Sequence, residues 1–167
     1  KEAKTAMYLM NRIIFAYQKM DPELYGNFSS TFTAVAINKR KEILIMHVGN
    51  TRLYLFRQGE LFQMTNDDTI AQQLLGKKEI TEQEYALHPD RGVLTKFLGM
   101  AEINPFITKG ALVTDDVLLL VSNGVYEMLP LDKIKQIFTN TKTSQEACEW
   151  IIEGSNDIGG VDNSAVV

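Results

Sequence analysis

The hydrophobic positions of the chain change their spacing several times, and each change predicts a different kind of element. Over the first turns of the chain, Ala3, Met7 and Ile14 recur at the spacing of one face of a helix. The pattern stops at Asp21-Pro22, because proline has no amide hydrogen with which to continue a helix. The chain is therefore predicted to open with an amphipathic helix.

Apolar runs follow, and their composition predicts β-strands. They are rich in valine, isoleucine, phenylalanine and tyrosine, and short polar turns at positions 38–41, 49–50 and 58–59 separate them. We expect three or four antiparallel strands in succession. The runs are STFTAVAI from Ser30, EILIMHV from Glu42, RLYLF from Arg52 and ELFQM from Glu60.

The rest of the chain alternates between helical and strand-like patterns. Residues 67–87 predict a helical hairpin, in which Thr81 and Glu84 have the spacing of a capping box. Strands are expected in NPFITKG, in DVLLLVS and in the closing GGVDNSAVV, with a short helix after Gly124 and longer helices at 131–138 and 143–153. No repeat or linker interrupts these elements, so residues 1–167 are interpreted as a single α+β domain.

Composition narrows the class of protein. The content of 45% hydrophobic and 23% charged residues is that of a globular chain, which excludes disorder, and the net charge of -4 argues against nucleic acid as a partner. No apolar run approaches the roughly 20 residues of a membrane span. The single cysteine, Cys148, cannot form an internal disulfide, so a reducing, cytoplasmic location is expected.

Candidate chemistry lies in loops at the ends of the predicted strands. In HVGNTRLYLF, VSNGVYEML and GGVDNSAVV, a glycine lies beside or near an asparagine or aspartate, and HPDR forms a fourth loop of interest. Any one of these motifs is explained by turn geometry, because glycine, asparagine and aspartate all favour turns. Together, at strand ends and in this order, they indicate a site at one edge of a sheet sandwich. The residues that carry this hypothesis are Asn50, Asn123 and Asp162.

In these motifs the chain resembles the metal-dependent serine/threonine protein phosphatases of type 2C in their bacterial form. FSSTFTAVAI is similar to the family's Met-Gly-Thr-Thr strand, VGNTR to its Val-Gly-Asp-Ser-Arg hairpin, and TNDD to the Thr-x-Asp-His that follows. LLLVSNGVYEML resembles the Ser-Asp-Gly strand and helix, and GGVDNSAVV the closing Gly-x-Asp-Asn strand. The resemblance covers nearly all of the chain and implies a β-sandwich of two antiparallel sheets, flanked by helices on both faces.

The resemblance also implies a metal site, and there this chain departs from the family. Family members bind two magnesium or manganese ions, which share a water that attacks phosphorus. The family's closing metal-binding aspartate matches Asp162, but two further aspartates fall on Asn123 and Asn50. Two dications about 4 Å apart repel by on the order of ten kcal/mol even at an effective dielectric constant of about 20, so the site needs several negative charges. We therefore expect no stable metal binding. Matching motif positions that we regard as structural are Gly49, Arg52, Gly124, Gly160 and Asn163.

A second departure concerns the start of the chain. The family begins with strands that carry a phosphate-binding arginine and an Asp-Gly pair whose aspartate bridges both metals. This chain starts at the helix that follows them and contains no Asp-Gly pair, so we expect a domain that is incomplete at its N-terminus. The amides at positions 50 and 123 then have two explanations: a neutralised catalytic site, or asparagines that satisfy glycine-flanked turns.

Three functions remain open at this point. The first is a phosphatase-like regulatory or protein-binding module without activity, with a phosphoprotein or a kinase as partner. The second is a magnesium- or manganese-dependent phosphatase whose missing segment lies upstream or in another chain. The third is a structural sandwich that oligomerises through an exposed sheet edge. Engineered replacement of aspartate would also give these amides, but Thr51 and Asp68, in place of the family's serine and histidine, favour natural divergence.

The two histidines and two of the arginines have simpler interpretations. His47 and His88 are far apart in sequence and have no cysteine nearby, which favours a core or turn role over metal ligation. Arg52 and Arg91 could meet phosphate, but a structural role beside neighbouring carboxylates is expected.

Overall fold

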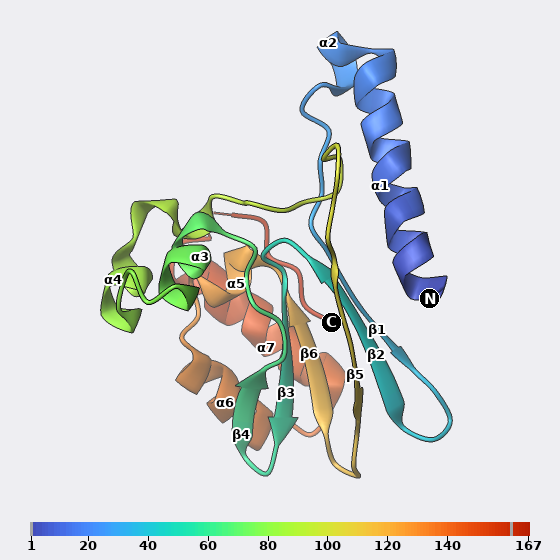
Figure 1. Cartoon of the computed structure of the whole chain (residues 1–167). Helices are drawn as coiled ribbons and strands as arrows, with labels where there is room; N and C mark the ends of the chain where they lie inside the picture. The colour runs from blue at the N-terminus through green and yellow to red at the C-terminus, as the bar shows by residue number, and fades with distance from the viewer. Residues whose placement is uncertain (1, 161) are drawn as a thin grey trace. The chain divides into compact units, whose positions relative to one another are not determined.

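The structure is a computed structural model that describes residues 2–160 and 162–167 (Figure 1). The chain forms two compact units, each of which is described by itself. Unit 1 holds residues 2–50 and Asn66–Leu112, and unit 2 holds Thr51–Thr65 and the described part of 113–167. Each unit contains a three-stranded antiparallel sheet.

Unit 1 is a sheet with the order β1-β2-β5 and one long helix. The central strand β2 alternates between buried and partly exposed positions, as expected when one face of a sheet meets a core. Ile45 lies opposite Val35 of β1 and Thr108 of β5. The elements are α1 (Glu2–Met20), α2 (Pro22–Tyr25), β1 (Phe32–Ile37), β2 (Glu42–Val48), α3 (Ile70–Gly76), α4 (Glu82–Leu87), a 3-10 turn at Pro89–Gly92 and β5 (Phe106–Ala111).

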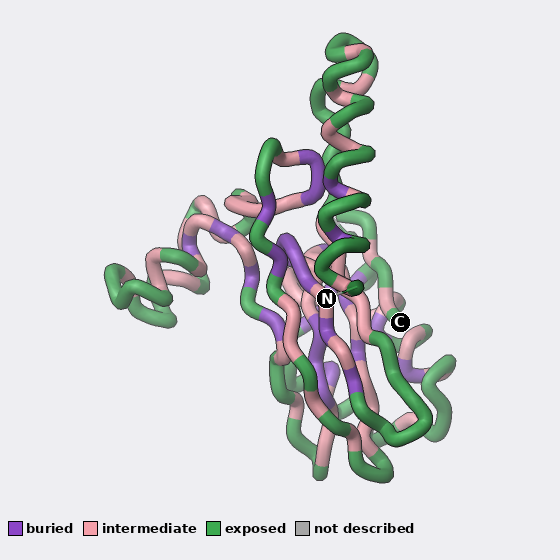
Figure 2. Tube along the Cα trace, turned by 45° about the vertical axis from the view of Figure 1, so that its right-hand side comes forward, coloured by how far each residue is buried: buried purple, intermediate pink, exposed green. Residues whose placement is uncertain are grey.

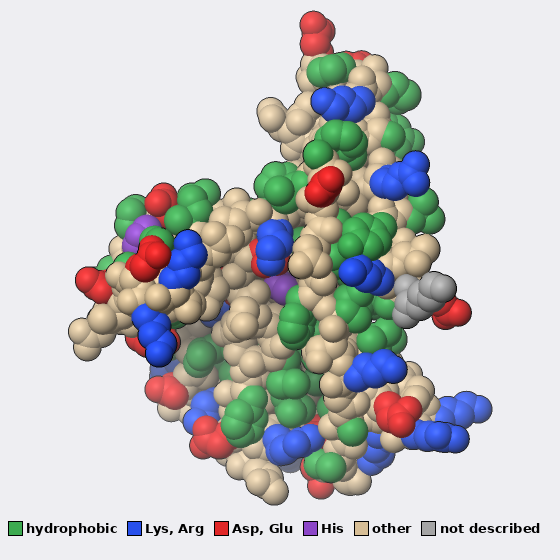
Figure 3. Space-filling model, viewed as in Figure 1, with side chains coloured by type: hydrophobic (Ala, Val, Ile, Leu, Met, Phe, Trp, Pro, Cys, Tyr) green, Lys and Arg blue, Asp and Glu red, His purple; other side chains and the backbone are tan. Residues whose placement is uncertain are grey.

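The core of unit 1 forms where α1 meets the sheet and the loop before β5. Met7 of α1, Val48 of β2 and Leu98 are buried together. The buried Asn11 is satisfied on both sides, because its amide donates to the carbonyl of Met100 and its oxygen accepts from the amide of Gly99. The other face of α1 stays open to solvent, and its hydrophobic side chains lie at the surface in Figure 3. These exposed side chains include Leu9, Ile13, Tyr17 and Met20.

Unit 2 is a sheet with the order β4-β3-β6 and three helices. Its core joins Tyr54 of β3 and Leu119 of β6 to Ile134 and Ile151, which come from two of the helices. Figure 2 shows buried positions along the strands and exposed ones at the strand ends. The elements are β3 (Arg52–Arg57), β4 (Glu60–Gln63), β6 (Val117–Val121), α5 (Asn123–Tyr126), α6 (Leu131–Asn140) and α7 (Ser144–Asp157).

The α+β class with two antiparallel sheets is confirmed, and most elements lie where the sequence predicts them. The opening helix ends at Met20, and the capping box of Thr81 and Glu84 is present at the start of α4. At α7, Thr143 caps the helix as expected, but the Glu146 carboxylate accepts from the amide of Lys142 rather than from that of Thr143. That the whole chain is a single domain stays a prediction.

Two expectations about strands need correction. The successive strands β2 and β3 belong to different sheets, because the turn at residues 49–51 leads the chain from one unit into the other. The predicted closing strand is reduced, within residues 162–167, to an isolated bridge between Val121 and Val166. The short helix α2 was not predicted; it begins at Pro22, and the Asp21 side chain accepts from the amide of Leu24. Proline stops one helix here and starts the next, because its fixed φ suits the first helical position.

Replacement of Ile45 by alanine should lower the free energy of unfolding by about 2–5 kcal/mol, because it opens a cavity at a fully buried position. The matched control is Ile37→Ala on β1, where the side chain is 57% exposed and the expected change is within about 0.5 kcal/mol. Denaturant unfolding of both variants measures the difference. Equal losses would contradict the assigned burial of Ile45 and exposure of Ile37.

Candidate functional site

The loop after β6 presents Asn123 and Gly124 at the end of a buried strand. β6 ends at Val121, and Ser122 precedes the four-residue helix α5, which starts with Asn123. Gly124 is buried, and a Cβ atom placed on it would lie 2.4 Å from the carbonyl oxygen of Asn163. Since real Cβ atoms do not approach backbone oxygen so closely, glycine at this position permits the C-terminal segment to pack against the loop.

The C-terminal segment, defined here as residues 162–167, is hydrogen-bonded to the end of β6. The amide of Leu120 donates to the carbonyl of Val167 at 2.9 Å, and the amide of Ser122 donates to that of Ala165 at 3.1 Å. The Ser122 hydroxyl accepts from the amide of Ala165 and donates to the carbonyl of Asn163. This hydroxyl therefore binds the segment instead of capping α5.

Asn123 and Asp162 meet at this junction. Nδ2 of Asn123 donates to Oδ2 of Asp162 at 2.9 Å, and the amide of Asn163 donates to Oδ1 of Asp162 at 2.7 Å. An ionised carboxylate can only accept, so the donor of the side chain at position 123 must be its NH₂ group. Both oxygens of Asp162 thus have a protein donor. The structure brings Asn123, Gly124, Asp162 and Asn163 together in unit 2.

The residues at this junction do not fit a pair of divalent ions. The donor set contributes one carboxylate, and the neighbouring side chain presents NH₂ rather than oxygen to it. Among the described residues there is no group of three or more histidine, cysteine, aspartate or glutamate side chains that could hold a metal ion. Magnesium and manganese favour several oxygen ligands with negative charge, which this set does not supply.

Asn50 and Gly49 form the turn after β2 in unit 1. Asn50 is 7% exposed, and Gly49 has a φ of 109°, which favours glycine. A Cβ atom at Gly49 would also lie 2.4 Å from Cγ2 of Thr31. The turn is bound to Asp68, whose carboxylate accepts from the amide of Gly49 at 3.1 Å and whose own amide donates to the Gly49 carbonyl at 2.7 Å.

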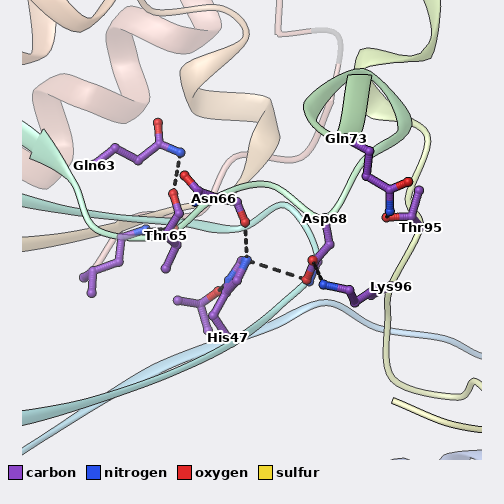
Figure 4. A network of polar contacts seen from close by, with 11 residues as sticks. His47, Gln63, Thr65, Asn66, Asp68, Gln73, Thr95 and Lys96 are labelled. Carbon is purple, nitrogen blue, oxygen red and sulfur yellow. Dashed lines mark hydrogen bonds and ion pairs between the residues drawn. The ribbon is translucent and has the colours of Figure 1, made fainter. Parts of the chain in front are cut away.

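A polar network extends from this turn to His47 and Lys96 (Figure 4). Oδ1 of Asp68 accepts from the ammonium group of Lys96 at 2.5 Å, while Oδ2 lies 4.0 Å from Nε2 of His47. Nε2 of His47 contacts the carbonyl of Asn66 at 2.9 Å, which can only accept, so Nε2 carries the hydrogen. Nδ1 then accepts from the hydroxyl of Thr33 at 2.8 Å. The neutral imidazole is therefore satisfied at both nitrogens.

The environment of His47 favours this neutral form. Burial of the ring lowers its pKa below 6.5, against the opposing influence of the Asp68 charge. A core role, as predicted, describes His47 well. The sequence did not indicate a role for Lys96. Its partner, Asp68, lies 28 residues earlier in the chain, and a contact over that separation leaves no periodic pattern in the sequence.

The remaining predicted residues occupy structural positions. The Arg52 guanidinium lies 3.7 Å above the ring of Tyr126 and donates to the hydroxyl of Tyr54. Both of these partners are aromatic side chains of unit 2, and the expected pairing with a carboxylate stays a prediction. Gly160 has a φ of 52° and follows Gly159, so the expected glycine turn is present before the C-terminal segment. Arg91 donates to the carbonyl of Ala86.

Unit 1 contains a groove on its sheet. It has a volume of about 490 Å³ and is lined by β1, β2 and β5, with Ile37, Ile43 and Lys109 among its walls. None of the predicted site residues lines it. In the described part of the chain, no helix is both long and apolar enough to cross a bilayer.

Comparison with known proteins identifies similar chains. No model of a protein family matches the sequence. The chain is 30% identical over 161 residues to the serine/threonine phosphatase stp of Listeria monocytogenes, which covers 95% of this chain and 62% of that relative. It therefore spans slightly under two thirds of the length of this curated relative.

Solved structures agree with this likeness. The serine/threonine phosphatase of S. agalactiae matches with a TM-score of 0.90 and 31% identity, over 97% of this chain and 66% of the other. The catalytic domain of the serine/threonine protein phosphatase PstP, solved in complex with two manganese ions, matches with a TM-score of 0.82 and 29% identity, over 93% of this chain and 64% of the other.

Acidification should destabilise unit 1 through His47. The pKa of His47 is lower in the folded chain than in the unfolded chain, so the unfolded chain takes up a proton first as the pH falls. The contribution of neutral His47 to the free energy of unfolding is therefore complete above pH 6.5 and is lost as the pH falls below it. The expected loss approaches about 1.4 kcal/mol per pH unit until the folded-state pKa is reached. Urea unfolding at several pH values between neutral and mildly acidic measures it.

His47→Gln should flatten this pH dependence, because it removes the group that titrates. The matched control is His88→Gln, which removes the other histidine of the chain. A slope that follows His88 and ignores His47 would refute the assignment.

Proposed function

This chain belongs to the bacterial type 2C serine/threonine phosphatase family, and we propose that it is a protein-binding or regulatory member that does not hydrolyse phosphate esters by two-metal chemistry. The activity of the whole protein, its substrates and its partners are part of this proposal, because the chain spans 62% of the Listeria relative.

The observation that carries the proposal is the hydrogen bond from Asn123 to Asp162. In two-metal hydrolysis, a water bound between dications becomes a nucleophile near neutral pH, and the anionic ligands hold those ions close together. At this junction the side chain at position 123 brings a hydrogen-bond donor and no charge. Asn50 brings no charge either, so two of the positions at which the resemblance implies aspartates are neutral.

The proposed partner is a protein that carries phosphorylated serine or threonine, or a kinase that produces it. The support is the likeness to proteins named as serine/threonine phosphatases. A domain with a phosphatase fold but without catalytic activity can still bind a phosphoprotein through the surface that binds substrate in an active enzyme. We place this function in a reducing cytoplasmic compartment, on the evidence of the single cysteine.

The alternative is a magnesium- or manganese-dependent phosphatase in which another segment or chain completes the site. It is favoured by the partial coverage of the relatives and by the two manganese ions in the PstP structure. Under this alternative the neutral side chains at positions 50 and 123 still weaken metal binding, because the added segment would have to supply most of the negative charge.

The purified chain should show no manganese-dependent hydrolysis of an aryl phosphate above the rate without protein. A family member with its aspartates intact, assayed at the same concentration, serves as the positive control. A manganese-dependent rate comparable to that of the control would refute the proposal. Activity that appears only when a further segment or chain is added would favour the alternative.

Calorimetric titration with manganese should give no saturable binding to the chain. The double variant Asn50→Asp, Asn123→Asp should gain weak binding, because a carboxylate at position 123 joins Asp162 in one donor set. Asn140→Asp adds a charge elsewhere in unit 2 and is the matched control. Saturable binding to the unmodified chain would contradict the interpretation of the amides as neutral substitutes.

A further inference from the structure

We propose that Asn123 and Asp162 form a metal-independent latch: their hydrogen bond holds the C-terminal segment to the end of β6, in the place where the family resemblance implies a cation between two carboxylates. The hydrogen bond of the Asn123 amide thus links positions 123 and 162, which a cation would otherwise link by its charge. The inference concerns how the fold is held together, so it does not depend on whether the chain is catalytic.

The segment gains from such a link because its other attachments are few and mostly exposed. Residues 162–167 are joined to β6 and the loop after it through one isolated bridge, a few backbone hydrogen bonds and the hydroxyls of Ser122 and Ser164. Val166 packs against the core of unit 2, but most of the segment is exposed. A short exposed attachment of this kind opens easily, and a side-chain bond at its first residue adds resistance to opening.

The latch lies beside a close contact between the two stretches of backbone. Gly124 permits the contact with the Asn163 carbonyl, and the Ser164 hydroxyl donates to the carbonyl of Gly124 at 3.2 Å. Beside this contact, Asn163 donates its amide to the carboxylate of Asp162. The carboxylate is therefore fixed relative to the backbone and oriented toward Asn123.

The choice of amide over carboxylate at position 123 has a direct electrostatic consequence. Nδ2 and Oδ2 lie 2.9 Å apart. With aspartate at position 123, two anionic oxygens would occupy these places, and they would repel each other unless a proton or a cation came between them. With asparagine the same geometry is attractive, and no ion is required.

The test uses the complete chain in the presence of EDTA. Asn123→Asp should lower the melting temperature by about 2–4 °C. It should also speed hydrogen exchange of the 162–167 amides on the order of fivefold, since one lost surface hydrogen bond changes the opening equilibrium by about that factor. Exchange is followed by mass spectrometry of C-terminal peptides.

The decisive variant exchanges the two side chains. Asn123→Asp combined with Asp162→Asn restores one amide and one carboxylate, so it should recover most of the melting temperature and of the exchange protection lost in the single variant. Asn140→Asp, which adds a charge to α6, should leave exchange of residues 162–167 unchanged. For the unmodified chain, millimolar manganese in place of EDTA should change neither measurement.

Three results would overturn the inference. The first is a single variant that exchanges as slowly as the unmodified chain. The second is an exchanged pair that is as labile as the single variant, which would mean that the two side chains are not coupled. The third is a rise in the melting temperature of the unmodified chain on addition of manganese.

Discussion

The hydrogen bonding of carboxylates by donors within the chain is the constraint on which both candidate regions depend. One oxygen of Asp162 accepts from the side-chain amide of Asn123 and the other from the backbone of Asn163, so the carboxylate has its hydrogen-bond donors without an external cation. Had position 123 been an aspartate, the same backbone path would bring like charges together, and it would persist only with a counter-ion. The amide of Asn123 therefore removes the need for a counter-ion at this junction.

The same constraint applies in unit 1, at the turn that contains Asn50. Asp68 is largely buried, and a buried carboxylate is costly unless it is paired and hydrogen-bonded. Lys96 supplies the charge and the amide of Gly49 supplies a further donor. His47 can then stay neutral beside them. The position at which the resemblance implies a histidine is thus occupied by Asp68, an acid paired with Lys96, so the turn is held by groups of this chain.

The sequence predicted elements well where a local signal marks both ends. β2 matches the run EILIMHV, because a turn precedes it and glycine follows it. Thr81 and Glu84 marked the start of α4 for a similar reason. The separation of β2 and β3 into different sheets could not be predicted, since both look like strands of one meander and only packing distinguishes them. The site residues were identified through motifs, but the contact of Asn123 with Asp162 joins positions 39 apart and depends on the tertiary path.

The core and the site use different residues, which explains how the fold can outlast a change of chemistry. In β6 and α5, Leu119, Val121 and Val125 are buried in the hydrophobic cluster, whereas Asn123 lies between the last two and points to the surface junction. Loss of a core side chain costs about 2–5 kcal/mol, but exchange of a carboxylate for an amide of the same shape at the partly exposed position 123 leaves that packing intact. Replacement of a flanking core residue is therefore expected to cost more stability than replacement of the residue between them. In the absence of a bound ion, an amide at position 123 is more stable than a carboxylate, because it removes the electrostatic repulsion with Asp162. Packing of the hydrophobic core does not reduce that repulsion.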